Sequence, residues 1–177
     1  GGTDVSSYAN TYGGVVINLA INLRQKLILY TEDDIYGRTT RFPSSANPRL
    51  GYSILTEYGL GSFHHSIVTS SFEGEIGAGL GSSGSFAVAL VGAITKAKKL
   101  NKSLGEIAAE AWDIEVNRLG GYGGKQDQYA AVMGGLNIMY FDRDSVAIKA
   151  FPRELAQKLH KYFLLVYTSG ERKSRLI

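Results

Sequence analysis

A glycine-rich turn in the middle of the chain constrains its fold more than any other segment. Residues 75–94, EIGAGLGSSGSFAVALVGAI, pass from glycines into Ser82 and Ser83 and then into an apolar run of helical length. A strand, a glycine turn and a helix N-terminus make an anion site, because free backbone N–H groups and the positive end of the helix dipole converge there. The alternative is a tight strand-to-helix turn in which Ser82 or Ser83 only caps the helix.

Known phosphate-binding motifs do not fit this turn. Gly79, Gly81 and Gly84 satisfy G-x-G-x-x-G, but a Rossmann site needs a second strand with a terminal acid about 20 residues later, and none follows. The turn also lacks the G-K-[ST] ending of a Walker A loop. VAIK at 146–149 matches a protein kinase strand by accident, because neither H-R-D nor D-F-G is present.

The composition is that of an ordinary globular domain. Of the 177 residues, 44% are hydrophobic and 20% are charged, and no apolar run reaches the ~18 residues of a membrane span. There is no cysteine, which excludes disulfide frameworks and thiolate sites. The net charge of +3 is too weak to indicate nucleic acid binding. We expect a cytoplasmic protein that binds neither nucleic acid nor membranes and that is able to form a homodimer.

Hydrophobic patterns and turn residues predict an α+β domain, because strands and helices alternate without a regular βαβ rhythm. Ser103 and Glu106 have the spacing of a capping box, and Gly120 ends the helix that they begin. The other helices are expected at 49–60, from the glycine turn to about 102, at 124–135 and at 152–160. Strands are expected at 15–23, 26–30, 66–73, 136–141, 146–151 and 162–168.

One carboxylate lies on the apolar side of the helix that begins near Ser103. Successive helical residues rotate by ~100°, which forms one apolar stripe from Leu104, Ile107, Ala108 and Ala111. Glu115 lies within ~30° of the centre of that stripe. A buried unpaired carboxylate is costly, so Glu115 needs a cation, hydrogen bonds or a proton. Two interpretations stay open: a structural pair with Arg118 or another cation, or ligation of Mg²⁺, which takes few protein ligands and bridges phosphates.

Asp127 stands among glycines and beside Lys125 in the segment GGYGGKQDQYAA. A carboxylate that a nearby cation keeps ionised can accept a proton from a substrate. The alternative is a solvated aspartate at a helix start, where the dipole favours negative charge. His64 and His65 precede a strand without a third ligand at metal-like spacing, so we interpret them as structural.

Four segments resemble the GHMP small-molecule kinases in order and spacing: GGTD, GAGLGSSG, AWDIEVNRLGG and GGKQDQYAAVMGGLN. Within that superfamily, GGTDVSSYANTYGGVVIN and GKQDQYAA look most like the D-glycero-D-manno-heptose 7-phosphate kinases of bacterial surface-polysaccharide synthesis. The resemblance implies a two-layer α/β N-terminal domain, shared with ribosomal proteins, at 1–151. It implies that 152–177 begin a truncated C-terminal domain, and that the first strand lies upstream of Gly1.

The resemblance also implies an activity and roles for individual residues. ATP would phosphorylate a sugar or sugar-phosphate hydroxyl, here the anomeric hydroxyl of the heptose 7-phosphate. Ser83 and Glu115 would hold Mg²⁺, and Asp127 would act on the acceptor hydroxyl. The ATP phosphates would lie against Gly77, Gly79, Leu80, Gly81, Ser82 and Ser83. Substrate contacts would come from Thr3, Asp4, Gly124 and Lys125 and, for a second phosphate, from Arg38, Arg41 and Arg172.

Other functions remain as competing hypotheses. One is a galactokinase-like or fucokinase-like sugar kinase, and another is a catalytically silent sugar or nucleotide sensor on the same fold. Retention of Asp127 and Glu115 favours an enzyme over a sensor. An RNA-binding module is disfavoured because no basic stripe with interleaved aromatic residues is present. Asp4 also has a simpler interpretation, as a turn residue after two glycines.

Overall fold

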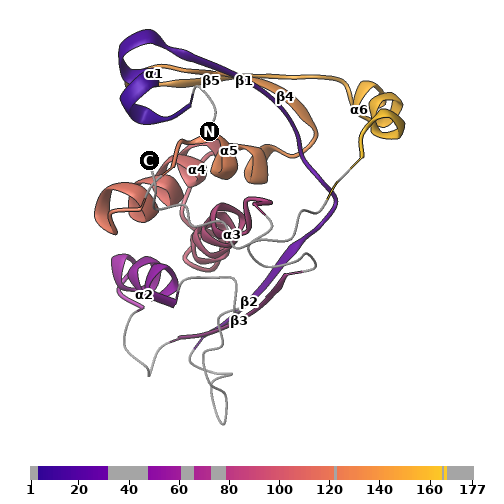
Figure 1. Cartoon of the computed structure of the whole chain (residues 1–177). Helices are drawn as coiled ribbons and strands as arrows, with labels where there is room; N and C mark the ends of the chain where they lie inside the picture. The colour runs from indigo at the N-terminus through magenta and orange to yellow at the C-terminus, as the bar shows by residue number, and fades with distance from the viewer. Residues whose placement is uncertain are drawn as a thin grey trace.

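The computed structural model describes residues 4–31, 48–60, 66–72, 79–121, 123–164 and 166. Figure 1 shows helices α3, α4 and α5 in the middle, the sheet of β1, β4 and β5 on one side, and the pair β2 and β3 on the other. Helix α3 (Ser82–Ala97) packs against β2, α4 (Leu104–Trp112) and α5 (Gln126–Met133). The architecture is therefore the α+β arrangement that the sequence predicts. In the described part of the chain, no helix is long and apolar enough to cross a membrane.

The strands of the described residues form two separate antiparallel sheets. In the first, β1 (Gly14–Leu19) pairs with β4 (Leu136–Phe141), which pairs in turn with β5 (Val146–Ala150). The hairpin of β4 and β5 is the one predicted from the sequence. In the second, β2 (Gln25–Thr31) pairs with β3 (Ser66–Phe72). Strands β1 and β2 are neighbours in sequence but belong to different sheets, so the chain crosses from one side of the helices to the other.

The helices agree with the predicted positions, with one addition. Helix α2 (Pro48–Glu57) begins at its proline, and α6 (Arg153–Leu159) leads into a 3₁₀ turn. The capping box of α4 is confirmed: the Ser103 hydroxyl accepts from the Glu106 N–H, and the Glu106 carboxylate accepts from the Ser103 N–H. Helix α1 (Ser6–Tyr12) was not predicted. Its serine, asparagine and threonine residues are weak helix formers, so the local sequence does not indicate a helix. Tertiary packing, in which Ala9 is buried, favours the helix instead.

The larger hydrophobic core surrounds α3. Phe86, Leu90 and Ile94 are fully buried there against side chains of α2 and α4, among them Leu50, Ile54, Ile107 and Ala111. Complete burial of a side chain of this size stabilises the fold by ~1.5–3 kcal/mol. A second cluster joins α5 to the three-stranded sheet through Tyr129, Met139 and Phe141. Because α3 is packed along its length, its first residues occupy a defined position.

Two sequence predictions are wrong in detail. Residues 162–164 and 166 are not in a strand: Tyr162 ends the 3₁₀ turn and is 75% exposed, and Leu164 is 85% exposed. An apolar run forms a strand only beside another strand, and the described residues place none there. Leu104 is 52% exposed because it is the first residue of α4, so the buried stripe begins at Ile107.

Candidate functional site

The glycine turn leads directly into the N-terminus of α3. Gly81 is the residue before the helix, and its φ of 68° lies in the left-handed region that favours glycine. Ser82 and Ser83 are the first two helical residues, and no side chain in the described part of the chain caps this end. The alternative in which one of these serines is the N-cap is therefore wrong. The first N–H groups of α3 have no intrahelical partner, and a ligand can bind to them.

Glu115 faces the start of α3. It lies in a π-helical turn, Asp113–Arg118, that continues α4. Its Oε1 accepts a hydrogen bond from Ser83 Oγ at 2.5 Å, and its Oε2 accepts one from Gln128 Nε2 at 2.8 Å. The two residues predicted to share a metal ion are thus in direct contact, although they are 32 positions apart. Glu115 is only partly buried, which leaves the carboxylate accessible.

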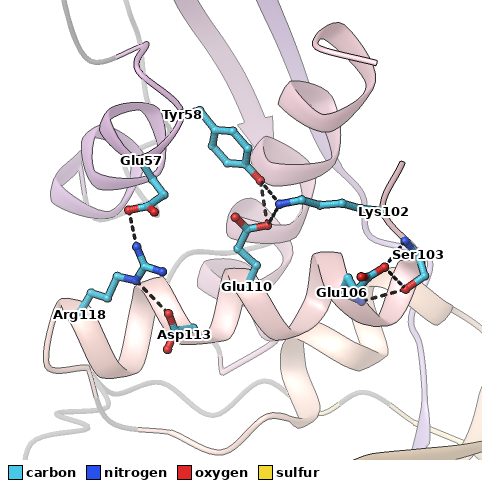
Figure 2. Close-up of polar contacts among 8 residues, drawn as sticks. All are labelled: Glu57, Tyr58, Lys102, Ser103, Glu106, Glu110, Asp113 and Arg118. Atoms are coloured by element: carbon cyan, nitrogen blue, oxygen red, sulfur yellow. Dashed lines mark hydrogen bonds and ion pairs between the residues drawn. The ribbon is translucent and has the colours of Figure 1, made fainter. Parts of the chain in front are cut away.

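Arg118 is not the partner of Glu115. Figure 2 shows the Arg118 guanidinium between the carboxylates of Glu57 and Asp113, with both of which it forms ion pairs. The same view shows that Lys102 pairs with Glu110 and donates to the Tyr58 hydroxyl at 3.0 Å. These contacts connect α2 to α4 and its π-helical turn. The structural alternative of an Arg118 pair for Glu115 is therefore wrong.

Asp127 is the second residue of α5 and is crowded on one side by α3. A Cβ at Gly84 would lie 3.0 Å from Asp127 Cβ, and a Cβ at Gly81 would lie 3.4 Å from Asp127 Cγ. The residue as a whole is nevertheless exposed. Burial by the neighbouring helix raises the pKa of Asp127, and the negative charges of Asp4 and Glu115 raise it further.

Lys125 does not keep Asp127 ionised, contrary to the sequence interpretation. Its Nζ lies 4.8 Å from the centre of the Trp112 ring, in a cation–π contact. The raised pKa of Asp127 also has the opposite sign to the effect of a nearby cation. The sequence places Lys125 two positions before Asp127, but the helix start turns the two side chains to different neighbours.

Asp4 is buried beside the start of α5. Only 2% of its surface is exposed, and its Oδ2 accepts a hydrogen bond from the Gln126 N–H at 3.1 Å. A Cβ at Gly124 would overlap this carboxylate, so glycine is needed there for steric reasons. Asp4 thus satisfies a backbone donor at the N-terminus of α5. Its Oδ1 has no hydrogen-bond partner among the described residues.

A cavity of about 250 Å³ opens between the glycine turn, α5 and the end of β1. Its wall includes Leu80, Gly81, Ser85 and Asp127, opposite Asn18 of β1. A second cavity, of about 380 Å³, adjoins it and also includes Ser85 in its wall. Asp127 therefore faces a space large enough for part of a small molecule, whereas Asp4 is buried outside this wall. Predicted site residues that lie outside the described part of the chain are Thr3, Arg38, Arg41, Gly77 and Arg172.

The donor atoms at Ser83 and Glu115 fit magnesium. Both are oxygens, as Mg²⁺ prefers, and their hydrogen bond shows that they converge on one point. Among the described residues no cluster of three or more His, Cys, Asp or Glu side chains is able to hold a metal. A site here would therefore depend on few protein ligands, with phosphate oxygens and water completing the shell.

Gln128 was not predicted as part of the site. It is 3% exposed and connects α5 to Glu115. Gln128 belongs to the KQDQ segment, but its position next to Asp127 in the sequence does not indicate that its side chain bonds to Glu115. Only the packing of α5 beside the π-helical turn brings the two side chains together.

The chain is similar to known kinases in sequence and in fold. Residues 50–135 match the GHMP kinases N terminal domain. The D-glycero-alpha-D-manno-heptose 7-phosphate kinase of Campylobacter jejuni is 30% identical over 199 residues, which cover 99% of this chain and 58% of that protein. The chain thus spans little more than half the length of this relative.

Two solved structures have a similar fold. A D-glycero-D-manno-heptose 1-phosphate kinase from Bacteriodes thetaiotaomicron is 28% identical with a TM-score of 0.71, and the match covers 86% of this chain and 56% of that one. The mevalonate kinase of L. major in complex with R-mevalonate is 18% identical with a TM-score of 0.52, covering 78% of this chain and 45% of that one. The second likeness concerns the fold alone.

Proposed function

Residues 50–135 match the GHMP kinases N terminal domain, and on that premise we propose that the chain uses ATP to phosphorylate a sugar or sugar-phosphate hydroxyl. The hydrogen bond between Ser83 and Glu115 carries the proposal. It joins a hydroxyl at a glycine turn to a carboxylate that is distant in sequence, and both are oxygen ligands of the kind that a phosphate-bound Mg²⁺ takes.

The ATP phosphates would lie at the N-terminus of α3. Residues 79–83 would contribute backbone N–H groups, and the helix dipole would favour the negative charge. The left-handed φ of Gly81 keeps this turn close to α5, so that the phosphates approach Asp127. Mg²⁺ held by Ser83 and Glu115 would neutralise the charge that develops on the transferred phosphoryl group.

Asp127 would orient the acceptor hydroxyl and take its proton. Its side chain faces the cavity beside Gly81, within reach of a molecule bound there. The raised pKa of this carboxyl makes it a stronger base once it is ionised. Phosphoryl transfer depends mainly on positioning and charge stabilisation, so the position of this residue matters as much as its basicity.

The acceptor is proposed to be D-glycero-D-manno-heptose 7-phosphate, phosphorylated at its anomeric hydroxyl. The names of two relatives, a heptose 7-phosphate kinase and a heptose 1-phosphate kinase, support a phosphorylated heptose. Residues 1–151 would form the ATP-binding domain, and 152–177 would begin a second domain. Binding of the second phosphate would involve Arg38, Arg41 and Arg172, and sugar hydroxyls would contact Thr3, Gly124 and Lys125. Asp4, which is 2% exposed and bonded to the Gln126 N–H, would instead hold the start of α5 in place.

A phosphoryl-transfer assay tests this function. The protein at its natural length is incubated with [γ-³²P]ATP, Mg²⁺ and one acceptor at a time: heptose 7-phosphate, unphosphorylated heptose, galactose, fucose or mevalonate. We expect transfer to heptose 7-phosphate above all others. Equal transfer to the unphosphorylated heptose would refute the acceptor but not the kinase activity. Binding of ATP without transfer to any of the five would instead favour a sensor.

A further inference from the structure

We propose that Gln128 is a positioning residue for the metal site: its side-chain amide holds Glu115 so that one carboxylate oxygen faces Ser83. This inference rests on the proposed function, because it assigns a task within the Ser83 and Glu115 pair. Neither the glycine turn nor the carboxylates indicated this role. It follows from hydrogen bonds that connect α3, the π-helical turn and α5.

The geometry gives each oxygen of Glu115 a separate donor. Gln128 Nε2 donates to Oε2 at 2.8 Å, and Ser83 Oγ donates to Oε1 at 2.5 Å. Since Gln128 occupies Oε2, rotation of the carboxylate is restricted and Oε1 stays directed at α3. Gln128 is 3% exposed and packed close to Gly84, where a Cβ would lie 3.4 Å from its Cδ. The amide is thus in a fixed position.

The backbone of Glu115 is held as well. The Gly121 N–H donates to the Glu115 carbonyl at 3.1 Å, and a side chain at Gly121 would collide with that carbonyl. Helical segments of the π type are uncommon and occur often at functional sites, where they redirect a side chain. The carboxylate is therefore restrained at two points, through its backbone by Gly121 and through its side chain by Gln128.

The chemistry of Gln128, the hydrogen-bond partner of Glu115, distinguishes a residue that positions the carboxylate from one that forms a structural ion pair with it. A lysine or arginine at this position would neutralise Glu115 and compete with a metal cation. The amide of Gln128 is neutral, so it orients the carboxylate and leaves its negative charge available. Outer partners that hydrogen-bond to metal ligands act in this way, and their loss typically lowers metal affinity by ~10-fold to 100-fold.

The test measures Mn²⁺ binding by electron paramagnetic resonance in the presence of the ATP analogue AMP-PNP. Gln128→Met keeps an unbranched side chain of similar length but has no donor, and Gln128→Leu provides a second variant with different packing. We expect both to bind Mn²⁺ about 10-fold to 100-fold more weakly than the wild type. Val132→Ala is the matched control, because Val132 is on α5 and packs in both hydrophobic clusters. It should lower thermal stability and leave Mn²⁺ affinity unchanged.

A double-mutant cycle with Glu115→Gln shows whether Gln128 acts through Glu115. If it does, Gln128→Met has no additional effect on Mn²⁺ affinity once Glu115 is replaced. Additive losses, or wild-type affinity in both Gln128 variants, would overturn the positioning role while leaving the proposed function intact. Failure of the wild type to bind Mn²⁺ with AMP-PNP would overturn the proposed function and the positioning role together.

Discussion

Among single residues, Asp127 has two properties that matter for catalysis: it lines the cavity, and it lies near other negative charges. We predict that Asp127→Asn lowers kcat by ~10²-fold or more, because it removes the proposed base while keeping the side-chain shape. ATP affinity should change little, since the carboxylate is assigned to the acceptor. Steady-state rates and nucleotide titrations measure the two effects. Asp144→Asn in the exposed β4–β5 turn is the control and should keep full activity.

Asp127→Asn should not destabilise the fold. A carboxyl whose pKa is raised in the folded protein is harder to ionise there than in the unfolded chain, so its charge costs stability at neutral pH. The cost is fully present above the folded pKa and disappears below the ordinary pKa of about 3.9. Asp127→Asn should therefore melt at or above the wild-type temperature at neutral pH, with the difference vanishing as pH falls. A lower melting temperature at neutral pH would contradict the raised pKa.

At the scale of helices, two glycines test the packing, because one is crowded by a neighbouring side chain and the other is not. A Cβ at Gly124 would overlap the Asp4 carboxylate at the start of α5, whereas a Cβ at Gly92 inside α3 would meet no described atom within 4 Å. We predict that Gly124→Ala destabilises the protein by ~1–3 kcal/mol through overpacking. Gly92→Ala should stabilise it by ~0.5–1 kcal/mol, because alanine favours the helix. Urea unfolding measures both changes, and equal effects would refute the arrangement at Asp4.

Nucleotide binding should be visible in the stability of the whole molecule. A ligand that binds only the folded state at 100 times its Kd adds ~2.7 kcal/mol, so AMP-PNP with Mg²⁺ should raise the Tm. We predict that Gly81→Val abolishes this rise, since its side chain would obstruct the phosphates. Gly59→Val is the control: Gly59 has a similar left-handed φ of 71°, and no atom of the described residues lies within 4 Å of a Cβ placed there. If both variants keep the ligand-induced rise, the phosphates bind elsewhere.

Short-range features of the molecule were predictable from the sequence by itself. The capping box at Ser103 and Glu106, the proline start of α2 and the β4–β5 hairpin depend on residues a few positions apart. Interactions between residues close in sequence stabilise these features, so the sequence is sufficient to identify them. The rotation of ~100° per residue predicted an inward Glu115, but this residue lies in a π-helical turn, where that rotation does not hold, and it is only partly buried. Helix α1 was missed because its local preferences are weak and packing outweighs them.

Only the tertiary structure decided which distant partners meet. Three contacts join residues that are far apart in the sequence: the pairing of β1 with β4, the ion pair of Arg118 with Glu57, and the cation–π contact of Lys125 with Trp112. No local pattern in the sequence indicates them. The Glu115 contacts with Ser83 and Gln128 belong to the same class. The physical reason is that the burial of α3 and α5, summed over two hydrophobic clusters, determines how the helices approach. Individual polar side chains then bond to whichever neighbours that packing brings within reach.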